Sequence, residues 1–239
     1  MKSITTALIF LLCSLVSFAG VGEPKLDHSS WDRLLQKHVT AQGNVNYEGF
    51  KKDLVALDAY LNSLSATNPD ANWTRSEAMS YWINAYNAYT IKLMLNNYPL
   101  KSIMNVNGGK AWDLKFINIK GEKYSLNNIE HDILREKFFD PRIHFAVNCA
   151  SISCPKLSNT AYFAEGLDGK LDKVAKEFIN NSSKNNITAD KAQISKLFDW
   201  YKDDFTKNGT VKDYLNKYST TKFTSNNISF KEYNWNINK

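Results

Sequence analysis

Cysteine is scarce in this sequence. Three cysteines occur in 239 residues, and one of them, Cys13, lies in an apolar run at the N-terminus. The other two, Cys149 and Cys154, are too few for a disulfide scaffold, so hydrophobic burial must stabilise the fold. Beyond the N-terminal run, no segment is long and apolar enough to cross a membrane.

Concentrated positive charge and the common nucleotide-binding motifs are also lacking. The net charge is +6, but the lysines are scattered among aspartates and glutamates, with no dense basic block. A nucleic-acid partner is therefore not expected. Neither a P-loop, a dinucleotide fingerprint nor a G-x-S-x-G elbow occurs, and we expect no cofactor.

The N-terminus has the pattern of a secretory signal peptide over residues 1–19. Lys2 precedes the apolar run 4–18, and small residues lead to a cleavage point after Ala19. The alternative is an uncleaved anchor, because 3–22 carries no charge and is about long enough to span a bilayer. We expect cleavage, export to the periplasm or the cell exterior, and no stable membrane insertion of the mature chain.

The mature chain 20–239 shows no repeat, linker or composition break, which indicates one domain. Its periodicity predicts a helix-rich α+β fold with a small antiparallel sheet. The predicted helices cover 31–39, 47–64, 75–97, 126–138, 163–180 and 211–218. The predicted strands are a hairpin within 115–124, then 142–147, a short strand near 186–188, one over 194–198 that enters a helix at 199, and alternating residues within 222–238.

The helix predicted over 75–97 is apolar nearly all round, so it should be the buried centre of the domain. A capping box formed by Thr74 and Glu77 marks its start. Asn84 and Asn87 lie three residues apart within it, and buried amides must find hydrogen-bond partners. They either fix neighbouring loops or orient a functional site.

The helix predicted over 126–138 has a carboxylate on its apolar stripe. Glu130 falls in the middle of that stripe and His131 at its edge. A carboxylate that faces a core needs a compensating partner. Glu130 is therefore either paired structurally or part of a site.

Residues 144–157, HFAVNCASISCPKL, hold both remaining cysteines and His144. A catalytic cysteine needs a base, usually histidine. If the chain is extended here, His144 and Cys149 are about 16 Å apart, so His131 is the better partner. The four intervening residues also permit a disulfide between Cys149 and Cys154. Zinc binding would use ligands without the usual spacing. The residues alone leave these alternatives open.

Four segments resemble the domain-of-unknown-function family 547, which occurs in exported bacterial proteins and in plant proteins. They are SYWINAYNAYTI (80–91), SLNNIEHDILR (125–135), DPRIHFAVNCASISCPKL (140–157) and ISKLFDWYKDDF (194–205). The resemblance covers roughly 76–233. Two positions depart from the bacterial pattern: Val147 replaces leucine, and Ala150 stands where glycine is common. The alanine at position 150 matters if the backbone of that residue has a positive φ.

The resemblance implies a fold similar to papain-like and transglutaminase-like thiol enzymes. Plant members of the family keep the first cysteine of the motif and often replace the second, which points to Cys149 as the chemically important one. The positions that match the family motif are Asn84, Asn87, Glu130, His131, His144, Cys149 and Cys154.

These observations predict an exported thiol-dependent hydrolase or acyl transferase that acts on an amide or thioester bond. Cys149 would attack, His131 would act as base and then acid, and Glu130 or Asn84 would orient His131. Backbone N–H groups of the 149–154 loop would hold the oxyanion.

Asn87, His144 and Cys154 are expected to have supporting roles. The alternative is a non-catalytic binding domain with a structural Cys149–Cys154 disulfide. A small-molecule or peptide substrate is expected, with no metal.

Overall fold

The computed structural model describes residues 25–239. The expected signal peptide, its alternative as an anchor and Cys13 all lie outside this range. Within it, no helix has both the length and the apolar character that a bilayer crossing requires.

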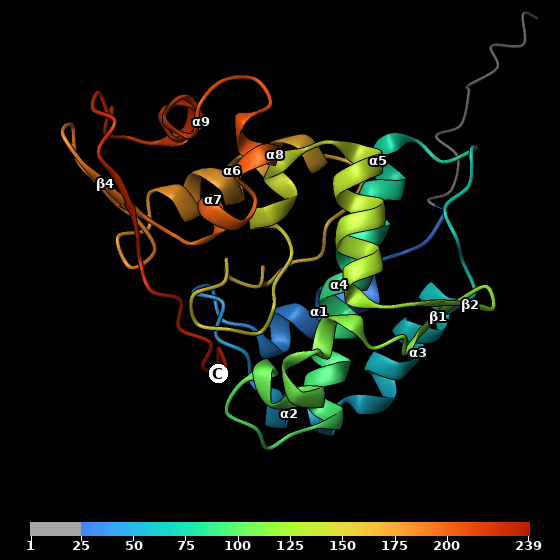
Figure 1. Cartoon of the computed structure of the whole chain (residues 1–239). Coiled ribbons are helices and arrows are strands. Elements are labelled where there is room, and N and C mark those ends of the chain that lie inside the picture. The colour runs from blue at the N-terminus through green and yellow to red at the C-terminus, as the bar shows by residue number, and fades with distance from the viewer. Residues whose placement is uncertain (1–24) are drawn as a thin grey trace, which may run out of the picture.

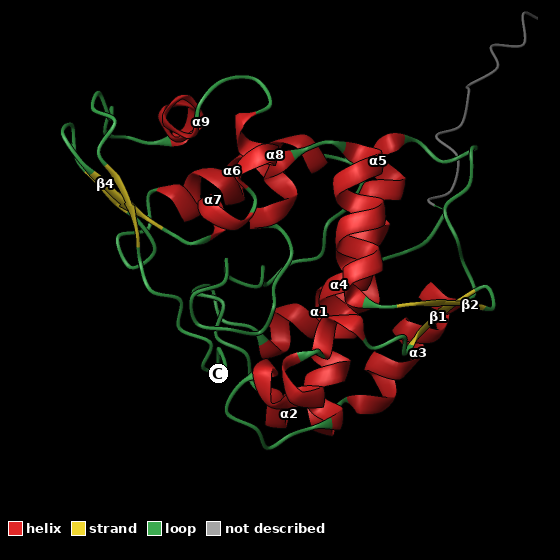
Figure 2. Ribbon diagram, in the orientation of Figure 1, coloured by secondary structure: helices red, strands yellow, loops and turns green. Residues whose placement is uncertain are grey.

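Helices form about half of the described structure and strands are short (Figure 2), which confirms the α+β class. The α-helices are α1 (Ser29–His38), α2 (Tyr47–Lys52), α3 (Leu54–Ser65), α4 (Arg75–Asn96), α5 (Glu136–Phe138), α6 (Leu167–Ile179), α7 (Leu197–Trp200), α8 (Lys202–Thr206) and α9 (Val211–Tyr218). The strands are β1 (Ile117–Ile119), β2 (Glu122–Tyr124), β3 (Asn186–Ile187), β4 (Ala192–Ile194) and β5 (Ile228–Phe230).

Helix α4 is the central helix, as predicted. Thr74 and Glu77 form the capping box at its start, and every residue from Met79 to Ile91 is buried. In Figure 1, α1 to α3 lie in the lower half of the molecule, while α6 to α9 lie at its upper left. Because α4 is surrounded on all sides, its polar residues must bond to neighbouring chain segments rather than to water.

Two apolar clusters form the core. The larger one joins α1 to α4, the β1–β2 hairpin and the segment 126–134. The smaller one joins α6 to α9 and the second sheet. That sheet pairs β3 with β4 in antiparallel fashion and β4 with β5 in parallel, so it is mixed and not wholly antiparallel as predicted.

Three predicted elements are wrong. The strand predicted over 194–198 ends at Ile194, and α7 already begins at Leu197. The helix predicted over 47–64 is interrupted at Asp53, whose backbone leaves the helical region and whose carboxylate bonds to His38 at 2.6 Å. The strand predicted over 142–147 is a 3₁₀-helix, Pro141–Phe145, in which Asp140 caps the N–H of Arg142. Ile143, His144 and Phe145 are all buried there, so their alternation in hydrophobicity did not indicate a strand.

The helix predicted over 126–138 has the expected extent but a different winding. Ser125 and Asn128 cap each other at its start, and Asn128–Arg135 winds as a π-helix before α5. π-helical turns are rare and frequently occur at functional sites. The wider turn brings both Glu130 and His131 to the cavity described next.

Candidate active site

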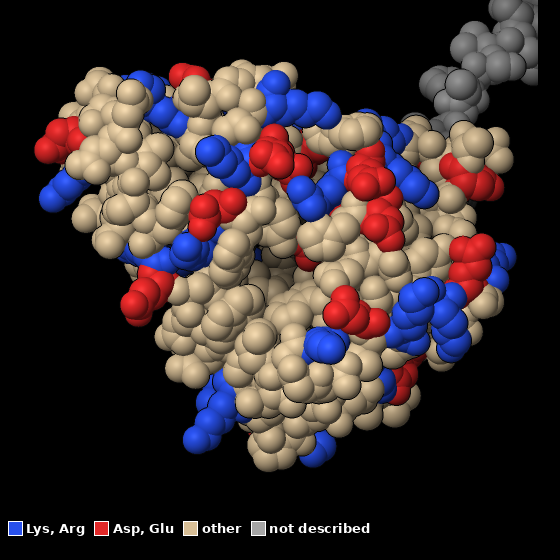
Figure 3. All heavy atoms as spheres, viewed as in Figure 1, with Lys and Arg blue, Asp and Glu red and all other residues tan. Residues whose placement is uncertain are grey.

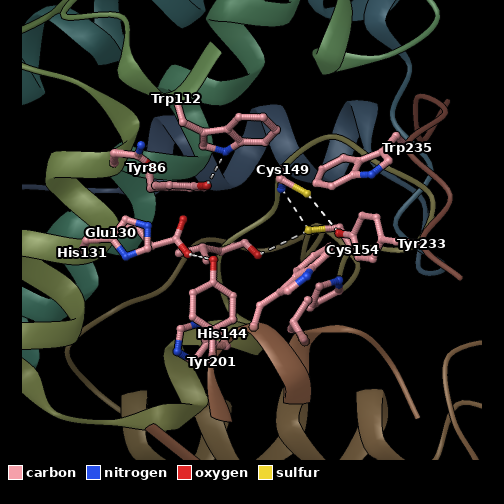
Figure 4. Close-up of a pocket in the computed structure, with 15 residues that line it drawn as sticks. Tyr86, Trp112, Glu130, His131, His144, Cys149, Cys154, Tyr201, Tyr233 and Trp235 are labelled. Carbon is pink, nitrogen blue, oxygen red and sulfur yellow. Dashed lines mark hydrogen bonds between the residues drawn. The ribbon is translucent and has the colours of Figure 1, made fainter. Parts of the chain in front are cut away.

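The candidate site is a cavity of about 210 Å³. Its walls come from α4, the π-helix, the loop after the 3₁₀-helix, α7 and the C-terminal segment. The face drawn in Figure 3 is hollowed at its centre, between α4 and α7 as Figure 1 labels them. Figure 4 shows the lining side chains, with Cys149 on one side of the cavity and His131 on the other.

Cys149 is a half-buried free thiol on the cavity wall. Its Sγ lies 3.2 Å from Ser151 Oγ and 3.3 Å from the hydroxyl oxygen of Tyr233. Its own N–H donates to the sulfur of Cys154 at 3.0 Å. Cys154 is also free, so the disulfide considered above is not formed.

These contacts favour ionisation of Cys149. Burial raises the pKa of this thiol, but hydrogen bonds from Cys154, Ser151 and Tyr233 outweigh burial and lower the pKa to about 7. Burial and the neighbouring Cys149 raise the pKa of Cys154 well above its ordinary value. Cys149 is therefore the thiolate of the pair near neutral pH, and the thiolate is the nucleophilic form.

The loop that carries Cys149 is strained at the next residue. Ala150 has φ +59°, in the left-handed region where glycine is favoured. The side chain of Asn148 stabilises this turn by accepting from the N–H of Ala150 at 2.9 Å. The position where the family commonly has glycine therefore does need a positive φ. Strain of this kind is concentrated at functional sites.

The N–H groups of this loop are already bonded. Besides the bonds from Cys149 and Ala150, Ile152 and Ser153 donate to the C-terminal segment, and Cys154 donates to the carbonyl oxygen of Ser151. The N–H of Ser151 points to the thiol of Cys149. This corrects the expectation that loop N–H groups hold the oxyanion, because none of the described ones is free.

The two amides of α4 fix loops and do not contact His131. Asn87 donates to the carbonyl of Ala146 at 2.9 Å and accepts from the N–H of Asn148 at 2.8 Å, so it holds the loop that leads to Cys149. Asn84 makes the same pair of bonds with the backbone of Tyr162. The expected role of Asn84 in orienting His131 is therefore wrong in this geometry.

His131 has its proton on the nitrogen that faces away from Arg135. The Nη1 of Arg135 lies 2.8 Å from Nδ1 of His131. Because a guanidinium only donates, Nδ1 must accept, and the neutral ring then carries its hydrogen on Nε2. In this arrangement His131 can donate a hydrogen bond into the cavity but has no free lone pair for a proton. This contradicts its expected role as base.

Glu130 contacts a tyrosine and not His131. Its side chain is only 4% exposed, and its Oε1 accepts from the hydroxyl of Tyr201 at 2.5 Å. Figure 4 shows the carboxylate pointing from the π-helix toward the middle of the cavity. The partner that a buried carboxylate requires is thus partly supplied by Tyr201, and the expected orientation of His131 by Glu130 is not found.

His144 is oriented by Asp204. Its Nε2 lies 2.7 Å from Oδ2 of Asp204, and its ring stacks on Tyr201 with 3.9 Å between centroids. Arg135 also binds Asp204, at 2.6 and 3.0 Å. Burial lowers the pKa of His144, so the ring is neutral near pH 7. Since Nε2 donates to the carboxylate, Nδ1 carries a lone pair, and Nδ1 has no partner within the described chain.

Comparison with known proteins identifies the central part of the chain. A family model described as "Protein of unknown function, DUF547" matches residues 71–179. Residues 71–179 match the DUF547 family. The match agrees with three of the four segments that carry the resemblance, and it includes α4, the π-helix and the Cys149 loop, whereas the segment 194–205 lies outside it. No curated protein and no solved structure matches the chain, so a papain-like fold stays a prediction.

The candidate site extends beyond the matched DUF547 region. Tyr201, Asp204 and Tyr233 lie after residue 179, yet each contacts a side chain of the matched region. The residues between β5 and the C-terminus run beside the Cys149 loop, where Ile152 and Ser153 bond to their backbone. The DUF547 match therefore supplies Cys149, while the segment after it supplies part of the site around that thiol.

Sequence reasoning missed several of these residues. Tyr201 and Asp204 lie in the segment 194–205, whose resemblance to DUF547 proteins was a usable signal. No sequence signal pointed to Tyr233, because 84 residues separate it from Cys149 and no motif surrounds it. In the described part of the chain, no three His, Cys, Asp or Glu side chains form a group suited to a metal ion.

Proposed function

We propose that this protein is an exported thiol-dependent hydrolase or acyl transferase that acts on a thioester or amide bond through Cys149. The observation that carries the proposal is the set of hydrogen bonds around Sγ of Cys149, which lowers the pKa of this thiol to about 7 at the wall of a cavity. An activated thiol in an accessible cavity is typical of a nucleophile.

In the first step the thiolate attacks the carbonyl carbon of the substrate. A bond forms between Sγ and that carbon, and the electron pair of the carbonyl bond moves to oxygen. His131 lines the same cavity, and its Nε2–H is suited to donate a hydrogen bond to that oxygen while keeping its proton. Collapse of the intermediate then breaks the bond to the leaving group and leaves an acyl group on Cys149.

The leaving group decides which substrates suit this site. A leaving thiolate departs without a proton, whereas an amine must receive one. Nδ1 of His131 already accepts from Arg135, so this ring is not arranged to relay a proton to a leaving amine. A thioester therefore fits the geometry better than an amide.

In the second step an acceptor attacks the acyl group and releases the Cys149 thiolate. For hydrolysis the acceptor is water, and its proton must go to a base. Nδ1 of His144 is suited to this role, because Asp204 fixes the opposite nitrogen and Nδ1 carries a free lone pair. This is the orientation principle of nucleophile–base–acid triads, with the base acting on the second step.

The competing hypothesis is a non-catalytic binding domain with a structural Cys149–Cys154 disulfide. It requires an oxidised pair, whereas both cysteines are free thiols in the structure. This difference favours the catalytic proposal.

The direct test is to trap the acyl intermediate. The reduced protein is incubated with S-phenyl thioacetate at pH 7, and the intact mass and its peptide map are recorded over time. We expect one acetyl group on Cys149 in the native protein and in Cys154→Ser, and none on Cys149→Ala. An acetyl group on Cys154 first, or none on either cysteine, would exclude the proposed nucleophile.

A further inference from the structure

Six tryptophan and tyrosine rings line the cavity. Trp112, Trp200 and Trp235 supply three indoles, and Tyr86, Tyr201 and Tyr233 supply three phenols. Several of the rings touch: the centroid of Tyr233 lies 4.4 Å from that of Trp235 and 4.8 Å from that of Trp200. Trp112 lies 5.8 Å from Trp235, which closes the wall on another side. The thiol chemistry proposed above uses only Tyr233 among these rings.

No lysine or arginine lines the cavity. Its acidic groups are the carboxylate of Glu130 and the thiol of Cys149. In Figure 3 the rim of the hollow is mostly tan, with most charged side chains farther out. The field inside the cavity combines the negative faces of the rings and these acidic groups with the charge of Arg135, which lies 5.2 Å from the ring centroid of Tyr201 and is paired with Asp204.

Glu130 makes no salt-bridge contact within the described chain. It forms no salt bridge with any side chain of residues 25–239, although it is more than nine-tenths buried. Arg135, on the same π-helix, is paired with Asp204 instead. Oε1 of Glu130 accepts from Tyr201, and no hydrogen bond from a described residue reaches Oε2. A buried carboxylate in this state is costly unless a cation from outside the chain compensates it.

We propose that this cavity binds an alkylammonium group. The positive nitrogen would lie against the ring faces, with the free oxygen of Glu130 as its counter-charge. Rings stabilise an alkylammonium ion more strongly when water is excluded, and quaternary ammonium groups are commonly bound by such aromatic cages. A neutral or anionic group would leave Glu130 without compensation.

The size of the cavity limits what enters it. About 210 Å³ is less than the volume of sites that enclose drug-sized ligands. A head group of a few carbon atoms around one nitrogen fits in this volume. The rest of a larger ligand would extend out of the cavity past Trp200, which is 46% exposed. If the thiol function proposed above is correct, the acyl substrate of Cys149 carries this cationic head group. The binding of the cation itself does not depend on that function.

Choline and 3,3-dimethylbutan-1-ol provide the test, because they have the same shape and differ in the charge at one atom. Their affinities are measured by isothermal titration calorimetry with the Cys149→Ser protein, so that no thiol chemistry contributes. We expect choline to bind about tenfold more tightly than the neutral alcohol. Glu130→Gln keeps an acceptor for Tyr201 and should reduce choline affinity by about tenfold.

Two further variants make the result specific. Trp200→Leu removes a half-exposed ring and should weaken choline binding severalfold, while leaving the core untouched. Glu165→Gln removes an exposed carboxylate outside the cavity and should change nothing. Circular dichroism verifies that each variant is folded.

Equal affinity for choline and the alcohol, or no binding of either, would overturn the proposal. So would choline binding that is unchanged in both Glu130→Gln and Trp200→Leu. None of these results bears on the nucleophile, because acetylation of Cys149 is measured separately with a neutral thioester. Failure of the cation site and failure of the thiol function are therefore distinguishable.

Discussion

The N–H of Cys149 donates a hydrogen bond to the sulfur of Cys154 at 3.0 Å, and both cysteines are free thiols. The two sulfurs therefore have different roles. Cys154 is more buried and its pKa is raised, so it keeps its proton and can donate to its neighbour. Cys149 becomes the thiolate. Cys154 is thus part of what activates the nucleophile, and the structure gives it more importance than the sequence comparison implied.

Cys154→Ala should therefore slow the alkylation of Cys149. The Cys154 thiol is the first of the hydrogen-bond donors that lower the pKa of Cys149, so its removal should raise that pKa toward the value of an ordinary thiol. We expect the alkylation rate of Cys149 at pH 7 to fall by about tenfold. Cys154→Ser retains a donor and is the control, with a smaller effect. The rates are measured by iodoacetamide labelling and mass mapping. If Cys149 is alkylated at the wild-type rate in both variants, Cys154 does not have this role.

Tyr233→Phe tests the donor from the C-terminal segment. The hydroxyl of Tyr233 lies 3.3 Å from Sγ of Cys149, and burial keeps the pKa of this phenol well above its usual value, so the hydroxyl stays protonated. Its loss should raise the pKa of Cys149 and slow alkylation at neutral pH by about fivefold. Tyr214→Phe is the matched control, because the buried hydroxyl of Tyr214 has no partner in the described structure. A pH profile that is the same in both variants would contradict the account.

The sequence predicted the local features of this site better than its long-range ones. The capping box at Thr74, the burial of Asn84 and Asn87 and the burial of Glu130 follow from patterns within one helix, and all three are confirmed. The prediction for 142–147 was wrong because a capped 3₁₀-helix and a strand can have the same alternation of apolar residues.

The partners of the predicted site residues depend on tertiary packing. Tyr201 and Asp204 come to Glu130 and His144 from α7–α8, about 60 to 70 positions later in the chain. The spacing of four residues between His131 and Arg135 is one that any helix brings together, but the π-helical winding of this segment leaves no mark in the spacing of apolar residues. Residue types therefore indicated a thiol site, whereas the proton arrangement at each imidazole required coordinates.

His144→Gln should separate the two chemical steps. If Nδ1 of His144 accepts the proton of the attacking water, the variant still forms the acyl group on Cys149 but loses it slowly. We expect the acetyl-enzyme from S-phenyl thioacetate to persist about a hundredfold longer. His131→Gln should instead slow its formation, because the hydrogen bond to the oxyanion is altered. Unchanged lifetimes in His144→Gln, measured by intact mass over time, would remove His144 from the mechanism.

Asp204→Asn should destabilise the fold in a pH-dependent manner. Burial raises the pKa of Asp204, but hydrogen bonds from His144 and Arg135 outweigh it and hold the pKa well below the usual range. Because the folded-state pKa is depressed, the carboxylate contributes stability above the pKa of an unfolded aspartate, about 4, and loses it as the pH falls further.

At pH 7 we expect Asp204→Asn to lower the free energy of unfolding by about 1–3 kcal/mol in urea titrations, and the difference from wild type should shrink below pH 4. The neighbouring Asp203 is exposed, and Asp203→Asn should change stability by less than about 0.5 kcal/mol. Equal effects of the two substitutions would show that the contacts of Asp204 do not stabilise the fold.

The pH dependence of Cys149 alkylation in the native, reduced protein shows whether this thiol is activated. Iodoacetamide is applied between pH 5 and 10, and the modified residue is mapped at each point. The account predicts a single adduct on Cys149 with a midpoint of about 7, while Cys154 stays unmodified. A midpoint near 8.5, the value of an ordinary thiol, or modification of Cys154 before Cys149, would contradict an activated nucleophile at this site.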